Sequence, residues 1–158
     1  MLRTRKQTWP TSTVIAVTVC ASGLSACVAH QPVSPEEFAV WTRQRFPPVL
    51  LSKIQDGTIR FDGGDGHSYE AAVVIVGAAA EPEGVTAEYF YISRKHGVQG
   101  RDWRPIMQAL SEHGGRRFDV LTVSVASEWG DRVYYFDISD FFGKGTGFFG
   151  MKDHDAGH

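Results

Sequence analysis

The sequence predicts an α+β domain in which two helices pack on an antiparallel sheet of about five strands. Three observations support this class. A capped amphipathic segment begins at Ser34, a short β-branched apolar run ends at Val76, and two glycine turns separate three strand-like runs in the C-terminal half. In α+β domains, helices and strands do not alternate regularly, and tight turns join consecutive strands.

The first helix is predicted from the signals at its two ends. Ser34 is suited to be the N-cap, Pro35 the first helical residue, and Glu37 the partner of Ser34 in a capping box. Phe46 would lie just beyond the last turn. The Pro47–Pro48 pair is expected to end the helix, because a residue before proline is disfavoured in helical conformation.

The next segments are predicted to be two strands joined by a turn. Residues 58–61 have strand character, and the following DGGDG sequence at 62–66 is the strongest turn signal in the chain. The run YEAAVVIV at 69–76 is short, apolar and β-branched, which indicates a buried central strand.

Residues 82–96 carry two competing signals. The aromatic centre at 89–92 favours a strand by propensity. The ends favour a helix, because Pro82 lies in the expected first turn and the three basic residues at 94–96 in the last turn would complement the helix dipole. Gly97 is placed to cap this helix. We therefore predict a helix over 82–96.

Three strands are predicted in the C-terminal half, over residues 105–112, 118–127 and 132–138. The segments between them, 113–115 and 129–131, are short and contain glycine. Such tight connections join antiparallel neighbours, whereas parallel strands need a longer crossover. The sequence therefore predicts a C-terminal three-stranded meander.

The N-terminal segment has the order of a bacterial secretory leader. Basic residues precede a short apolar run at 14–21, which is well below the about 20 residues that span a bilayer. Small residues then lead to the tetrapeptide Leu24-Ser25-Ala26-Cys27. This arrangement resembles the signal peptide and lipobox of bacterial lipoproteins. The resemblance implies that residues 1–26 are removed and that Cys27 is lipidated, which would attach the protein stably to a membrane.

The same resemblance implies a location and a domain organisation. Val28 follows Cys27, and in this class an Asp at that position retains the protein at the inner membrane, so we expect the outer membrane, facing the periplasm. Residues 27–33 would form a lipidated tether. Residues 34–142 would form a single α+β domain, and the glycine-rich residues 143–158 a flexible tail.

Composition narrows the function classes. The chain has 16 Lys and Arg against 18 Asp and Glu, and removal of Arg3, Arg5 and Lys6 would leave 13 against 18, a formal charge of −5. Such a charge does not suit nucleic acid, and it favours a basic protein partner in the envelope. Cys20 would be lost and Cys27 lipidated, so no thiol would remain for a disulfide, a catalytic cysteine or a thiolate metal site.

Three segments of the domain, GGDGHSYEAAVVI, GVTAEYFYI and VYYFDISDFFGKG, resemble those of small, uncharacterised bacterial proteins. This resemblance implies no activity and supplies no functional residues. We expect no cofactor, since no phosphate-binding loop follows the glycine-rich turn. We also assign no catalytic nucleophile, because Asp65, His67 and Ser68 are nearly contiguous, whereas the members of a triad converge from different elements.

The first candidate ligand site is the glycine-rich turn, where Asp62, Asp65 and His67 lie close together in sequence. Its consecutive N–H groups could form a nest for an anion. Calcium would want more oxygen ligands than Asp62 and Asp65 supply, and we predict no metal site. A plain β-turn requires Asp and Gly at the same positions, so this interpretation stands beside the ligand site.

Glu70 and Glu88 are the candidates for an enzyme. Glu70 opens the predicted strand at 69–76, and Glu88 lies in the aromatic-rich helix. If both face one cleft, they could act as an acid and base pair, as paired carboxylates do in glycoside hydrolysis. The alternative function is therefore a carboxylate-based hydrolase of cell-envelope material. Surface carboxylates, or ion pairs with Arg94 or Arg101, are the other interpretation.

Aromatic residues gather toward the C-terminus, and the candidate partner contacts are Trp129, Phe141, Phe142, Phe148 and Phe149. These side chains offer more apolar surface than a terminal turn usually buries, so an exposed patch would indicate a binding surface. Packing in the core is the other interpretation. Together with the anchor and the acidic charge, the pattern favours a protein-binding module: an inhibitor, an immunity protein or an accessory of envelope assembly.

Overall fold

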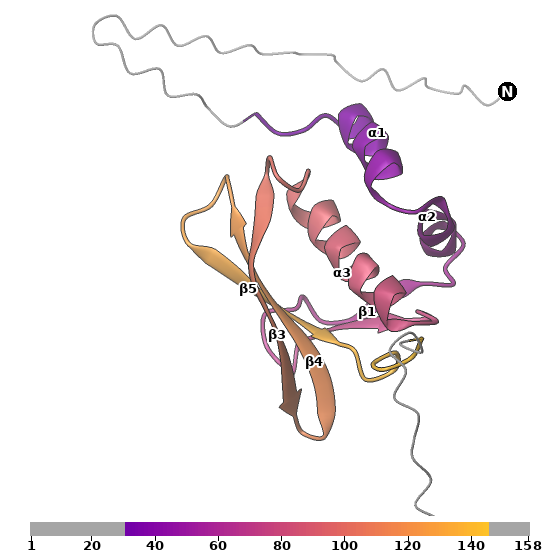
Figure 1. Cartoon of the computed structure of the whole chain (residues 1–158). Helices are drawn as coiled ribbons and strands as arrows, with labels where there is room; N and C mark the ends of the chain where they lie inside the picture. Colours follow the sequence, from indigo (N-terminus) through magenta and orange to yellow (C-terminus); the bar gives the residue numbers. More distant parts are fainter. Residues whose placement is uncertain (1–30, 146–158) are drawn as a thin grey trace, which may run out of the picture.

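The computed structural model describes residues 31–145 and confirms the α+β class (Figure 1). One five-stranded sheet is combined with three helices. The helices are α1 (Pro35–Arg45), α2 (Pro48–Gln55) and α3 (Glu81–His96). The strands are β1 (Arg60–Gly63), β2 (Val73–Val76), β3 (Trp103–His113), β4 (Arg116–Val125) and β5 (Asp131–Asp137).

The sheet has the strand order β1-β2-β5-β4-β3. The predicted meander of β3, β4 and β5 is confirmed, and its strands begin and end within two residues of the predicted bounds. The prediction of a purely antiparallel sheet was wrong in one place, because β2 and β5 are parallel, with Val73 opposite Phe136. Helix α3 brings the chain back across the sheet, so β3 runs in the same direction as β2. Strand β4 is antiparallel to β3 and β5 is antiparallel to β4, so β5 also runs in the direction of β2.

The predicted number of helices was also wrong, because a third helix, α2, follows the two prolines. The Pro47–Pro48 pair does end α1, but Pro48 is the first residue of α2 and Pro47 is its N-cap. Proline is well suited to the first helical position, since its missing N–H has no intrahelical partner there. Leu50 of α2 is buried, so packing against the domain stabilises this short helix.

The predicted caps of α1 and α3 are confirmed. The Ser34 hydroxyl accepts a hydrogen bond from the Glu37 N–H at 3.2 Å, and the Glu37 carboxylate accepts one from the Ser34 N–H at 3.1 Å. Together these bonds form the capping box. Helix α3 ends at Gly97, whose φ of 104° is unfavourable for residues with a side chain.

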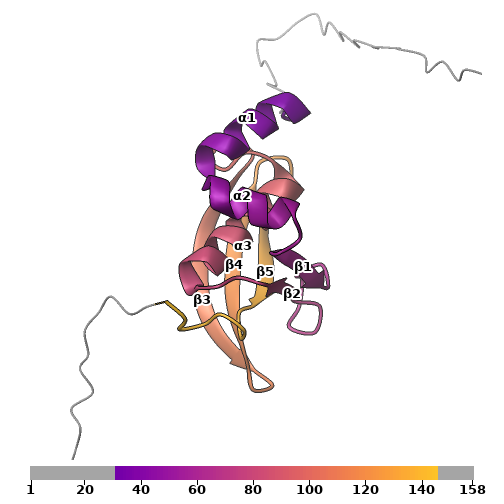
Figure 2. The ribbon, with the colours of Figure 1, turned by 90° about the vertical axis from the view of Figure 1, so that its right-hand side faces the viewer.

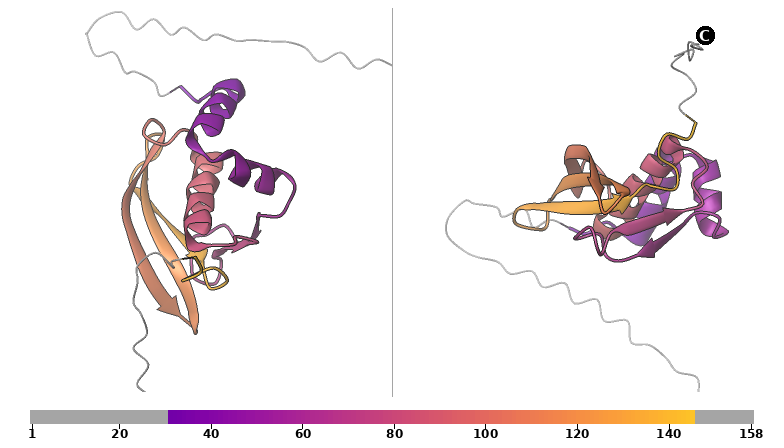
Figure 3. Two further views of the ribbon diagram at one scale, coloured as in Figure 1. Left: turned by 45° about the vertical axis from the view of Figure 1, so that its right-hand side comes forward. Right: turned by 90° about the horizontal axis from the view of Figure 1, so that it is seen from below.

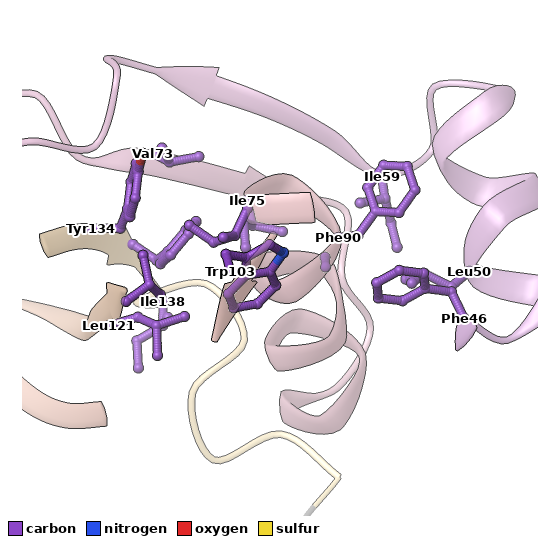
Figure 4. Packing of buried hydrophobic residues seen from close by; sticks show 14 of the residues in the cluster. Phe46, Leu50, Ile59, Val73, Ile75, Phe90, Trp103, Leu121, Tyr134 and Ile138 are labelled. Atoms are coloured by element: carbon purple, nitrogen blue, oxygen red, sulfur yellow. The ribbon is translucent and has the colours of Figure 1, made fainter. Parts of the chain in front are cut away.

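All three helices lie on one side of the sheet. Helix α3 packs directly on the sheet, and α1 and α2 lie on the side of α3 that faces away from the sheet (Figures 2 and 3). The core therefore has two connected parts, which Figure 4 shows. Between the sheet and α3 lie Val73, Ile75, Trp103, Leu121, Tyr134 and Ile138. Between α3 and α2, Phe90 packs edge-on against Phe46, with 5.4 Å between the ring centroids.

The strand predicted at 69–76 is shorter than expected, because β2 contains only Val73–Val76. The residues before it form turns across the sheet face that α3 does not cover. Tyr69 makes ring contacts there with Phe118 and Tyr135, at centroid distances of 5.1 Å and 4.6 Å, and its hydroxyl hydrogen-bonds with that of Ser111 at 2.7 Å. These contacts hold 69–72 out of the sheet.

The folded part continues past the predicted end of the domain at residue 142. The Glu81 N–H donates to the Lys144 carbonyl at 2.9 Å, and the Gly143 N–H donates to the Glu81 carboxylate at 3.2 Å. These bonds attach the C-terminal turn to the start of α3. The rest of the predicted tail, from residue 146, lies outside the described residues.

Candidate functional site

The carboxylates of the glycine-rich turn are engaged locally. Asp62 accepts a hydrogen bond from the Arg60 guanidinium at 2.9 Å, and Asp65 accepts one from the His67 N–H at 3.1 Å. All three candidate residues are exposed. Within residues 31–145, no group of three or more His, Cys, Asp or Glu side chains is arranged to hold a metal ion.

Two backbone N–H groups of this turn are engaged as well. Gly64 donates to the Ala72 carbonyl at 3.1 Å, and Gly66 donates to the Ala71 carbonyl at 2.7 Å. An anion nest needs consecutive N–H groups that point at the ligand, and these two point at carbonyls instead. The turn interpretation accounts for the contacts of Asp62 and Asp65, whereas the His67 ring lies against Tyr134, with 5.2 Å between the ring centroids.

The aromatic residues predicted as partner contacts differ in their exposure to solvent. Phe141 is fully buried, so its prediction as a partner contact was wrong. Its ring packs on α3 at Gly84, where the lack of a side chain makes room for it. Phe142 is half-buried beneath the Arg117 guanidinium, which lies 4.4 Å from the ring centroid. Trp129, in the turn between β4 and β5, is fully exposed. Phe148 and Phe149 lie outside the described residues.

The hypothesis that Glu70 and Glu88 face one cleft is wrong, whereas the other interpretation, a surface carboxylate, holds for Glu70. Glu70 is exposed and lies 3.7 Å from His113, at the tip of the β3–β4 hairpin. Glu88 is fully buried on the face of α3 that meets the sheet. Within residues 31–145, neither carboxylate forms an ion pair with Arg94 or Arg101, and Arg101 pairs instead with Asp102 at 3.0 Å.

Glu88 instead meets Asp119, a second buried carboxylate on β4. Asp119 is in phase with Leu121 and Val123, so its side chain points at α3. As an ion, Glu88 would have no hydrogen-bond donor within residues 31–145. Burial, and then the neighbouring Asp119 charge, raise the pKa of Glu88 well above its ordinary value. Protonated Glu88 would have a hydrogen-bond acceptor in Asp119, and the two side chains form a buried carboxyl pair.

The surroundings of the pair complete a small polar site. The Gln108 amide of β3 donates to Asp119, and the Tyr89 hydroxyl of α3 donates to the Gln108 carbonyl oxygen at 3.4 Å. A cavity of about 230 Å³ adjoins Glu88, Gln108 and Asp119 and extends to Leu110 and Phe142. Two neighbouring carboxyl groups, one of which has a raised pKa, are an arrangement that acid–base catalysis uses.

Sequence reasoning missed Asp119 and Gln108. The available signal was the position of Asp119 in the alternation of β4. It is a charged residue at an inward-facing position, and the other inward-facing residues of this strand are apolar. A buried acid of this kind needs a partner, and helix α3 supplies Glu88. The partner itself was not predictable from spacing, because residues 88 and 119 meet only when α3 packs on β4.

A second notable surface is the edge of the sheet. Strand β3 has 11 residues, is exposed along most of its length, and has β4 as its only neighbour in the described sheet. Its side chains of Ile106, Met107 and Leu110 are more than half exposed. A register shift next to Pro105 interrupts one end of the edge, and the stretch from Met107 to His113 pairs regularly with β4.

Comparisons with known proteins identify no relative. No family model, no curated protein and no solved structure matches this chain.

Within residues 31–145, every helix falls short of the length and apolarity that crossing a membrane requires.

Proposed function

We propose that this chain is a lipid-anchored protein of the bacterial envelope and that it acts as a protein-binding module. The observation that carries the proposal is the exposed edge of β3 with Ile106, Met107 and Leu110. A free edge strand offers unpaired backbone donors and acceptors, and a strand of another protein can pair with it. Exposed apolar side chains along the edge would add contact area.

The position of the tether supports this use of β3. Pro32 and Val33 line the same cavity as Gly97 and Ser127, so the chain enters the domain at the end that carries the β4–β5 turn. The tip of the β3–β4 hairpin lies at the opposite end (Figure 1). A chain from Cys27 to Val33 spans at most about 20 Å. An anchor on Cys27 would therefore keep Trp129 near the membrane and direct the hairpin away from it.

The proposed partner is a basic protein of the envelope. The formal charge of −5 expected after removal of the leader would speed the encounter with such a protein at low ionic strength. The exposed edge of β3 would serve one of three roles: inhibition of an envelope enzyme, immunity to a toxin, or assembly of an envelope complex. A contact at Trp129 would add a side chain that often dominates binding energy.

Leu110→Arg is expected to weaken binding of the partner at least about tenfold, because it puts a charge in place of the most exposed of the three apolar side chains of the proposed contact. The measurement uses the lipidated protein in its own cells, with a photo-crosslinking residue at Met107, and quantifies the adduct. Val49→Arg on α2 is the matched control, since Val49 is 64% exposed and Leu110 is 61% exposed. Equal adduct formation in both variants would contradict the proposal.

The second candidate function is the carboxylate-based hydrolase, and the buried carboxyl pair of Glu88 and Asp119 favours it. It ranks below the binding module because the adjoining cavity, about 230 Å³, is smaller than the roughly 300 Å³ at which ligand pockets usually begin. If it is right, wild-type protein releases soluble fragments from purified cell wall and Glu88→Gln releases none. A wild-type protein that releases no fragments rules the hydrolase out.

A further inference from the structure

One cavity is separate from the carboxyl pair and from the edge of β3. It has a volume of about 460 Å³ and lies where the end of α2, the strand β1 and the last turns of α3 meet. This volume falls within the range of small-molecule sites in proteins. The cavity is open to solvent, so a ligand could enter it without a conformational change.

The walls of this cavity are mainly apolar and aromatic. Ile54 and Ile59 contribute the aliphatic part, and Phe61 and Tyr91 contribute two rings. The two ring centroids are 5.4 Å apart, and the ring planes are inclined by 49° to each other. Both aromatic residues are partly exposed, so their ring surfaces remain available to a ligand.

The charged residues that line the cavity are all cations: Arg60, Arg94 and Lys95. Arg60 is paired with Asp62 at 2.9 Å. Arg94 is exposed, and its guanidinium has no ion-pair partner within residues 31–145. For a chain with an excess of acidic residues, this is a local reversal of charge.

Lys95 is held in place by two kinds of contact. Its amino group donates to the Asp65 carbonyl at 3.1 Å and lies 5.7 Å from the Tyr91 ring centroid. A lysine amino group can donate three hydrogen bonds, so this one retains donors for a ligand. Arg94 and Lys95 also complement the dipole at the end of α3, but that role requires no cavity beside them.

We propose that this cavity binds a small amphiphilic anion, a phosphate or carboxylate that carries a ring or a short aliphatic group. Arg94 would bind the anionic oxygens through its planar guanidinium, and Lys95 would add a point charge. The apolar group of the ligand would lie against Phe61 and Tyr91. This site goes beyond the proposed binding of a protein by β3, and it uses none of the same residues.

Titration of the full chain carrying Cys27→Ser with phenyl phosphate, followed by NMR, tests the proposal. We expect saturable shifts of the amide signals of Phe61, Tyr91 and Lys95. Arg94→Gln should weaken binding about tenfold, because it removes a charge-assisted pair of hydrogen bonds. Arg104→Gln, an exposed arginine on β3 outside the cavity, is the matched control and should leave the affinity unchanged.

Two further titrations test the ligand class and its source. Inorganic phosphate should bind about fivefold more weakly than phenyl phosphate, because it lacks the ring contacts. The second titration uses vesicles of phosphatidylcholine with phosphatidylglycerol. If they compete with phenyl phosphate, the natural ligand is a lipid headgroup; if they do not compete, it is a soluble anion. Three results would overturn the proposal: no saturable binding at millimolar concentration, equal binding of inorganic phosphate, or equal weakening by Arg94→Gln and Arg104→Gln.

Discussion

Replacing Phe141 by alanine is expected to lower the free energy of unfolding by about 3 to 5 kcal/mol. The Phe141 side chain is fully buried, and it joins the C-terminal turn to α3 through its contact with Gly84. Its removal would leave a cavity between these two segments. Denaturant unfolding measures the effect, and Phe142→Ala is the matched control, since Phe142 is only half-buried.

The contact with Gly84 provides an independent check on the same packing. A Cβ atom at position 84 would collide with the Phe141 ring, so Gly84→Ala should itself be destabilising, by about 1 to 3 kcal/mol. In the double variant the two costs should not add, because the new methyl group enters the space that the ring has left. An unchanged unfolding midpoint in Phe141→Ala would mean that Phe141 is a surface residue after all.

Glu88→Gln is expected to make the domain more stable at neutral and alkaline pH. The raised pKa of Glu88 means that the folded state keeps a proton which the unfolded state releases above about pH 4.3. The wild-type protein should therefore lose up to about 1.4 kcal/mol of stability per pH unit between that pH and the raised pKa. The amide introduced by Glu88→Gln does not titrate in this range, and it can still donate a hydrogen bond to Asp119.

Unfolding free energies of the two proteins between pH 4 and pH 8 measure this effect. The difference in favour of Glu88→Gln should be smallest at the acidic end and grow as the pH rises. Glu70→Gln is the control, because Glu70 is exposed and hydrogen bonds from its own N–H and from Ser68 lower its pKa. A difference that stays constant across this range would show that Glu88 is ionised in the folded protein.

Several elements were predictable from the sequence because short-range chemistry determines them. The capping box of Ser34 and Glu37, the end of α3 at Gly97 and the two hairpins of the meander each depend on residues only a few positions apart. Helix α3 was predictable despite its strand-like aromatic centre, since the signals at its ends are local. The edge position of β3 was not part of that prediction, because local signals do not order the strands of a sheet.

The candidate lipid anchor also belongs to the sequence alone, as Cys27 lies outside the described residues. Its assignment depends on the order of a basic start, an apolar run and the tetrapeptide that ends at Cys27. The lipidation of Cys27 and the location in the envelope stay predictions. Cys27→Ser, which removes the acceptor sulfur, should release the protein from the membrane fraction.

Only the tertiary structure decided which distant residues meet. The parallel pairing of β2 with β5, the meeting of Glu88 with Asp119 and the burial of Phe141 against Gly84 join positions separated by more than thirty residues. Local signals state which face of a helix or strand is apolar, but they do not state what covers that face. The sequence by itself therefore determined the elements whose ends carry local signals, such as α1, α3 and the meander, and the predicted location of this protein. Packing determined the extent of β2, the formation of α2, and which carboxylates, aromatic rings and cations are available for function.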